Sequence, residues 1–190
     1  MSEYGEATEK DTVRMGRQIK MENKGEVSSV TCLVFKRHLP GTMEKVWAHL
    51  TDTTLLPAWF GEESSIEGRQ GGVVHLMGGH IRGIVTQWQP HQKLIYTWNV
   101  FDPNNEPDAV SAYPESYLTF ELEAREGNEV TLTFTHFPIL ERFVPQSAMG
   151  WHTMLDILSA ELNGEAAVER SVYMQKNAEF YNVDLNNLAR

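Results

Sequence analysis

The sequence predicts an α+β fold in which an antiparallel sheet packs against a long C-terminal helix. Apolar residues alternate with threonines from Glu129 to Phe137, as in a strand with one buried face, and His136 falls on the apolar side. The next segment, which ends at Asn163, carries an apolar stripe at helical spacing. Short turns between the remaining strand signals favour a meander of neighbouring strands.

The first strand is expected in Val27–His38, ended by the turn Leu39–Pro40–Gly41. Cys32, the only cysteine, excludes an internal disulfide and is expected to be a small buried residue of this strand. Two short helices should follow. Thr42 is a suitable N-cap for the first, and Leu55–Phe60 forms the second.

About five or six antiparallel strands are expected after these helices. Val73–Met77 and His80–Gln89 should pair across Gly78–Gly79, a two-residue hairpin signal. Lys93–Val100 and Tyr117–Glu123 continue the sheet. The segment between them, Phe101 to Glu115, contains three prolines and is expected to be a loop. Whether this loop covers the mouth of a pocket stays open.

The chain divides into three predicted parts. Residues 1–27 form a charged tail without sustained apolar periodicity, and residues 28–164 form one domain that ends at the helix stop Gly164. Residues 165–190 form a helical extension, with Val172 and Phe180 among its apolar residues. Whether the extension packs on its own domain or on a partner copy stays open.

Composition narrows the function classes. The net charge of −10 argues against nucleic acid and against anionic membrane surfaces, because both require an excess of Lys and Arg. The chain has no run of 18 apolar residues, and its N-terminus lacks the apolar segment of a secretory signal, so a cytoplasmic protein is expected. No phosphate-binding loop and no nucleophile elbow occur, and no cofactor is expected.

Six motifs resemble those of one known family. Residues 83–98, GIVTQWQPHQKLIYTW, resemble its segment "GxVxExxPPxxLxYTW", and residues 131–137, TLTFTHF, resemble "RLTLTHxGF". The other four are Leu39–Asp52, Leu55–Phe60, Gly71–Gly72 and Gly150–Trp151. Over roughly Val30 to Asn163 the chain therefore resembles the START-like (SRPBCC) superfamily, in the branch named for the activator of heat-shock-protein ATPase.

The resemblance implies a helix-grip fold, in which a curved antiparallel sheet wraps around the long C-terminal helix and encloses a cavity. Phe60 stands where the family often has a second tryptophan, which would reshape the mouth of the pocket. The superfamily contains binding proteins, enzymes and co-chaperones, so the fold alone does not decide the function.

The first hypothesis is a protein that binds a small hydrophobic or aromatic molecule in this cavity. Such sites are mostly apolar with a few polar groups. The alternative is that the same residues simply fill the core. The expected lining residues are Trp59, Phe60, Met77, Trp88, Tyr96, Trp98, Phe120, His136, Trp151 and Leu155.

The second hypothesis is an enzyme of the cyclase, dehydratase or hydrolase kind, with His136 as acid or base and Tyr96 as the second polar group. The alternative is a core histidine bonded to the backbone. The third hypothesis, implied only by the family branch, is a co-chaperone with a chaperone partner. A homodimer is also left open.

A metal site is not expected. His75 and His80 flank the glycine pair, and His75 should lie opposite Arg82, but no third ligand has suitable spacing. His152 and Asp156 are four residues apart, off the apolar stripe of the last helix, where a surface hydrogen bond is the expected contact.

Overall fold

The computed structural model describes residues 29–101, 113–166 and 168–188. These residues form seven strands, four α-helices and two short 3-10 helices, labelled η. Their bounds are β1 Leu33–Pro40, α2 Met43–Thr51, α3 Leu56–Trp59, β2 Ser65–Ile66, β3 Val73–Leu76, η1 Met77–Gly79, β4 Ile81–Gln89, β5 Lys93–Val100, β6 Ser116–Arg125, β7 Glu129–Phe137, η2 Glu141–Phe143, α4 Val144–Asn163 and α5 Arg170–Tyr181. The predicted tail and residues 102–112 of the predicted loop Phe101 to Glu115 lie outside the described residues.

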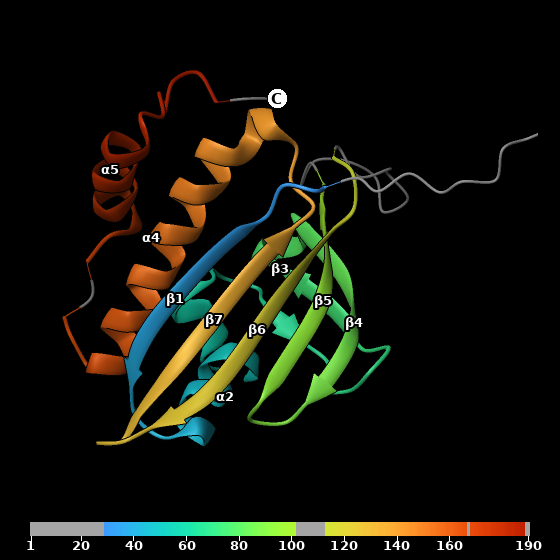
Figure 1. The fold of residues 1–190 in the computed structure, drawn as a ribbon, viewed down its shortest axis with the longest axis vertical. Coiled ribbons are helices and arrows are strands. Elements are labelled where there is room, and N and C mark those ends of the chain that lie inside the picture. The colour runs from blue at the N-terminus through green and yellow to red at the C-terminus, as the bar shows by residue number, and fades with distance from the viewer. Residues whose placement is uncertain (1–28, 102–112, 167, 189–190) are drawn as a thin grey trace, which may run out of the picture.

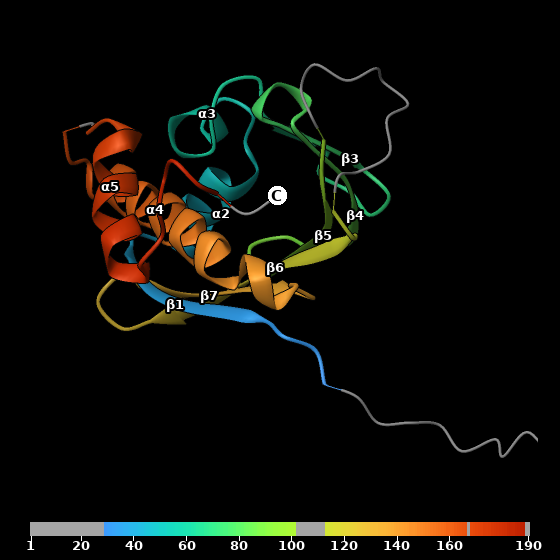
Figure 2. The ribbon, with the colours of Figure 1, turned by 90° about the horizontal axis from the view of Figure 1, so that it is seen from above.

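The strands form one antiparallel sheet in the order β1-β7-β6-β5-β4-β3-β2. The sheet is strongly curved, and α4 lies on its concave side together with α2 and α3 (Figures 1 and 2). Strands twist with a fixed hand, so a sheet of this size curls and leaves a concave face that a helix can fill. The α+β prediction with a helix gripped by a curved sheet is confirmed.

The first strand was misplaced at both ends by the sequence pattern. β1 pairs with β7 from Leu33 opposite His136 to Pro40 opposite Glu129, so it begins after Cys32 and includes Pro40. A proline is tolerated there because β1 is an edge strand, whose outer N–H groups need no partner. Cys32 precedes the strand and is exposed, which contradicts the expected burial.

The glycine pair belongs to a longer connection than a two-residue hairpin. Leu76 opposite Ile81 is the last pair of β3 and β4, so four residues, 77–80, join the strands. Met77, Gly78 and Gly79 all have positive φ, at 54°, 64° and 85°. Glycine adopts this conformation freely, whereas Met77 is held there against steric cost. β2, which the sequence analysis missed, has two residues, too few to show a period.

The core forms where α4 meets the inner face of the sheet. Trp151, Leu155 and Leu158 of α4 are all 5% exposed or less. The Trp151 ring lies 4.2 Å from the ring of Phe134 on β7, measured between centroids. Gly164 ends the helix at φ 68°, as predicted. α4 is therefore anchored in the sheet by one apolar stripe.

The C-terminal extension packs on its own domain, which answers the question that the sequence left open. α5 lies along α4, on the side away from the sheet (Figure 2). Asn177 is buried and donates a hydrogen bond of 3.2 Å to Thr153 Oγ1. Arg170 donates a hydrogen bond of 3.0 Å to the Trp59 carbonyl, which ties the start of α5 to α3.

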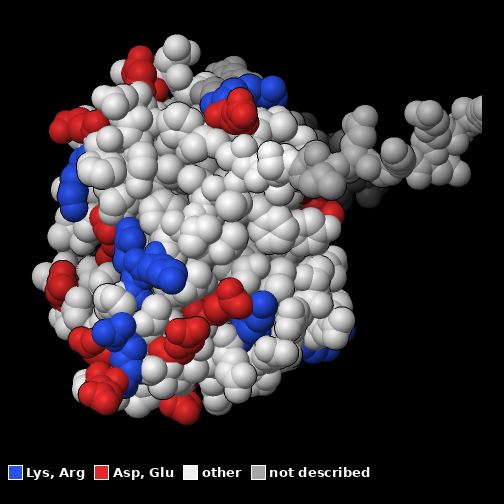
Figure 3. All heavy atoms as spheres, viewed as in Figure 1, with Lys and Arg blue, Asp and Glu red and all other residues white. Residues whose placement is uncertain are grey.

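On the face seen in Figure 3, which includes the outer surface of the sheet, acidic and basic side chains are interspersed. The described residues of this face therefore form no wide basic surface. No helix in the described parts of the chain is both long enough and apolar enough to cross a membrane.

Candidate functional site

A pocket opens between the sheet and the first turns of α4. Trp98 and Val100 of β5 contribute to one wall, and Ile139, Phe143 and Met149 contribute to the other. The lining also contains the polar residues His80, Ser116, His136, Gln146 and Ser147. Its described residues include no Asp, Glu, Lys or Arg.

The structure brings only part of the expected lining to this pocket. Met77, Trp98 and His136 line it. The other seven residues lie elsewhere, in the core or packed against it: Trp59, Phe60, Trp88, Tyr96, Phe120, Trp151 and Leu155. They lie on the inner face of the sheet, on α3 and on α4, where the elements pack against one another, whereas the pocket lies beside the first turns of α4.

Two of these tryptophans show why an inward aromatic residue does not have to line a pocket. Trp59 is 1% exposed, and its indole N–H donates a hydrogen bond of 2.7 Å to the His49 carbonyl. Trp88 packs edge-on against Trp47, with ring centroids 5.0 Å apart. The first contact joins α3 to α2 and the second joins β4 to α2, so both rings pack between elements rather than around a cavity.

His136 is the centre of a hydrogen-bond chain. The indole N–H of Trp151 donates to His136 Nδ1 over 3.1 Å, and His136 Nε2 lies 2.9 Å from Ser116 Oγ. An indole nitrogen can only donate, so Nδ1 must accept and the proton of the neutral ring must lie on Nε2. Nε2 then donates to Ser116, whose hydroxyl donates to the Trp98 carbonyl over 3.2 Å.

Burial lowers the pKa of His136 from 6.5 to about 4, because the charged ring loses its hydration. At neutral pH the ring is therefore uncharged, and both of its nitrogens are already bonded. A general acid or base works best with a pKa near the working pH and with a free nitrogen facing the substrate. The geometry favours a structural role for His136, bonded to side chains rather than to the backbone.

Tyr96 does not supply the second polar group that the enzyme hypothesis requires. Its side chain is fully buried, stacks on Phe120 and lies outside the pocket lining. Its hydroxyl has no hydrogen-bond partner among the described residues, and burial raises its pKa. The polar group beside His136 is Ser116 instead.

Two polar residues that the sequence analysis did not connect lie in the pocket wall. His80 follows η1, and Gln146 lies in the first turn of α4. His80 Nδ1 and Gln146 Oε1 are both buried without a hydrogen-bond partner. One signal could have pointed to Gln146: it is three and four residues before Met149 and Gly150, which puts all three on one helix face.

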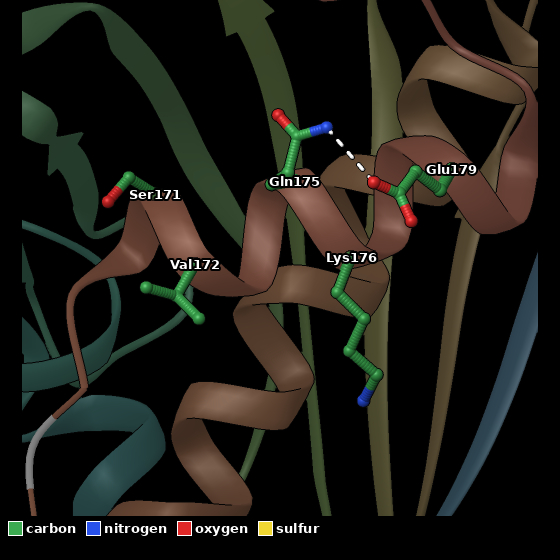
Figure 4. A pocket seen from close by; sticks show the side chains of 5 residues that line it. All are labelled: Ser171, Val172, Gln175, Lys176 and Glu179. Atoms are coloured by element: carbon green, nitrogen blue, oxygen red, sulfur yellow. Dashed lines mark hydrogen bonds between the residues drawn. The ribbon is translucent and has the colours of Figure 1, made fainter.

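A second hollow lies on the outer face of α5 (Figure 4). All five of its lining residues come from this one helix, and Gln175 donates a hydrogen bond of 3.2 Å to Glu179. Side chains of a single exposed helix cannot enclose a molecule, so this hollow is not a candidate binding site.

His75 lies opposite Arg82 in the pairing of β3 and β4, as expected. Among residues 29–101, 113–166 and 168–188, no three His, Cys, Asp or Glu side chains are close enough to hold a metal ion. His152 Nε2 lies 3.4 Å from Asp156 Oδ1, in a half-buried position rather than on an open surface, and this contact is an ion pair only when the ring is protonated. The hydrogen-bond partner of the His152 ring is the Tyr181 hydroxyl of α5, 3.1 Å from Nδ1.

Solved structures share this fold. CalU16 from Micromonospora echinospora has a TM-score of 0.62 and 22% identity, covering 80% of this chain and 86% of its own. An HSP90 activator from Plasmodium falciparum has a TM-score of 0.58 and 21% identity, covering 71% and 97%. The Aha1 dimer from Colwellia psychrerythraea has a TM-score of 0.55 and 22% identity, covering 70% and 96%.

At these identities the structural likeness establishes the fold alone. No curated protein sequence matches the chain. The profile of the family described as "Activator of Hsp90 ATPase homolog 1-like protein" matches residues 41–163, more than half of the chain. The matched segment runs from the turn before α2 to the end of α4 and so contains six of the seven strands. The chain therefore belongs to the activator of Hsp90 ATPase homolog 1-like family, within the START-like (SRPBCC) superfamily.

Proposed function

We propose that this protein binds a small, uncharged, hydrophobic or aromatic molecule in the pocket between the sheet and α4. The support is the pocket wall, which combines apolar side chains with a few polar groups and contains no charged residue in its described part. That composition is typical of sites that hold apolar small molecules. Trp98 and Phe143 offer ring faces and edges on which an aromatic ligand would pack.

Binding is favoured over catalysis because of the state of His136. Its low pKa and its two internal hydrogen bonds leave it neutral and occupied at neutral pH. The enzyme hypothesis would need a different acid or base in the same pocket.

The test is native mass spectrometry of the purified protein, followed by thermal unfolding with small aromatic compounds such as indole and naphthalene. A ligand at 100 times its dissociation constant should stabilise the fold by about 2.7 kcal/mol. Ser147→Trp should fill the pocket and abolish that gain. Ser171→Trp, on the exposed face of α5, is the matched control and should keep it.

Equal stabilisation of wild type and Ser147→Trp would show that the compound binds elsewhere. An empty protein that no apolar compound stabilises would contradict the proposal.

A second candidate function is stimulation of an Hsp90-type chaperone. It is favoured by the family membership, since the family is named for Hsp90 ATPase activation. The test is chaperone ATPase activity during titration with this protein. A flat response at saturating concentration would exclude this activity.

A further inference from the structure

We infer that the pocket selects a ligand with a hydroxyl group, and that His80 and Gln146 are the two side chains that recognise it. This inference rests on the proposed binding function and specifies the class of ligand. It starts from two atoms that the fold buries without a partner, His80 Nδ1 and Gln146 Oε1.

Buried polar atoms in folded proteins are nearly always hydrogen-bonded, so each exception requires an explanation. Here two exceptions line the same pocket, one from the sheet side and one from α4. Both residues belong to a wall that is otherwise largely apolar, but the two atoms themselves are turned away from solvent. Because neither atom has an internal partner, a side-chain rotation that turns it toward the pocket costs no hydrogen bond and lets a bound molecule satisfy it.

Two other polar residues of the wall, His136 and Ser116, already bond to protein groups. His136 accepts from Trp151 and donates to Ser116, and Ser116 donates to the Trp98 carbonyl. A ligand would have to break this chain to bond to His136 or to accept a hydrogen bond from Ser116. His80 and Gln146 can instead bond to a ligand without losing an internal contact.

The chemistry of the two atoms defines the ligand group. A neutral imidazole nitrogen either donates or accepts, according to its tautomer. The glutamine side chain presents an acceptor at Oε1, or a donor if its amide is rotated by 180°. A hydroxyl group both donates and accepts, so it is compatible with each of these states.

A charged ligand fits the site poorly. The described lining offers no Asp, Glu, Lys or Arg, so an ion would lose its hydration without gaining a counter-charge. The inferred ligand class is therefore an uncharged aromatic or alicyclic molecule that carries a hydroxyl group.

The experiment compares naphthalene, 1-naphthol and 1-methoxynaphthalene, three probes with one ring system. Calorimetric titration of wild type should show 1-naphthol binding roughly tenfold more tightly than either other probe, the ratio expected for about one added hydrogen bond. In Gln146→Leu and His80→Leu this ratio should fall below threefold, while the affinity for naphthalene stays within threefold of wild type. Gln175→Leu on α5 is the control and should keep the tenfold ratio.

A second measurement does not depend on any ligand. Because Gln146 Oε1 has no internal partner, Gln146→Leu without ligand should melt at the same temperature as wild type or higher. A lower melting temperature would show that the side chain stabilises the free protein, and it would overturn the inference.

The outcomes separate the two levels of the proposal. Tight binding of all three probes with equal affinity would overturn the hydroxyl inference and leave the binding function intact. No binding of any probe to wild type, at concentrations where the probes are soluble, would count against both.

Discussion

The indole N–H of Trp151 donates a hydrogen bond of 3.1 Å to Nδ1 of His136 and so joins α4 to β7 inside the core. This bond fixes the tautomer of His136, which directs its remaining proton to Ser116 on β6. One side chain from the helix therefore determines how side chains of two adjacent strands, β6 and β7, are bonded in the pocket wall.

The fold should lose stability as the pH falls below 6.5. The folded protein holds His136 neutral with a pKa of about 4, whereas the unfolded chain takes up a proton near pH 6.5. Its contribution to the free energy of unfolding is complete above pH 6.5 and is lost between pH 6.5 and 4. The loss is on the order of 3 kcal/mol. Urea unfolding at pH 7.5, 5.5 and 4.5 measures it.

His136→Asn is the control for this pH dependence. The asparagine oxygen can still accept from Trp151, but the side chain does not titrate. The variant should therefore lose less stability than wild type between pH 7.5 and 4.5. Burial also lowers the pKa of His152. If wild type and His136→Asn lost the same amount of stability, the pH dependence would come from His152 or from other groups and not from His136.

Gly83→Ala should be severely destabilising. Gly83 lies in β4, opposite Val74, and a Cβ there would overlap the carbonyl oxygen of Thr97 on β5. The two strands would have to separate, and overpacking of this kind typically costs about 1–3 kcal/mol or more. Thermal and urea unfolding at neutral pH would measure the change.

Gly150→Ala is the matched comparison for that substitution. Gly150 lies within α4, and a Cβ there would meet no atom within 4 Å. Alanine forms helices better than glycine by about 1 kcal/mol, so this variant should be more stable than wild type. If both alanines had the same effect, the close approach at Gly83 would not be the cause.

Asp156→Asn should loosen α5. Asp156 lies on α4 with an 18% exposed side chain, 3.4 Å from His152, 3.8 Å from Lys176 of α5 and 3.9 Å from Arg37 of β1. It also accepts a hydrogen bond of 3.4 Å from Asn177. Removal of the charge should cost about 1–3 kcal/mol, since bonds to a charged group are among the stronger ones. Faster exchange of the backbone amide hydrogens of α5 would show that the helix is held less tightly.

Glu121→Gln controls for the loss of a carboxylate. Glu121 pairs with Lys93 over 2.8 Å, but its side chain is 43% exposed, so its loss should cost less than about 1 kcal/mol. Exchange in α5 should stay unchanged in this variant. If Asp156→Asn left the exchange of α5 equally unchanged, the charge cluster would not be what holds the helix.

The elements were predictable because each of them depends on its own local pattern. Thr42 accepts a hydrogen bond from the Lys45 N–H and caps α2, as its residue type indicated. The alternation in residues 129–137 predicts His136 on the buried face of its strand without reference to its hydrogen-bond partners. The same reasoning failed for Cys32, because strand periodicity does not specify where a strand begins.

The sequence by itself determined the order of the longer elements, the inward faces of their strands, the apolar stripe of α4 and the family, since these follow from periodicity, capping residues and local motifs. Only the tertiary structure decided which inward residues line the pocket. Tyr96 and Phe120 share the inner face of the sheet with Trp98, but they are buried in the core, whereas Trp98 lines the pocket. Packing between segments far apart in the chain determines that difference, and it also brings His80 and Gln146, 66 positions apart, to one pocket wall.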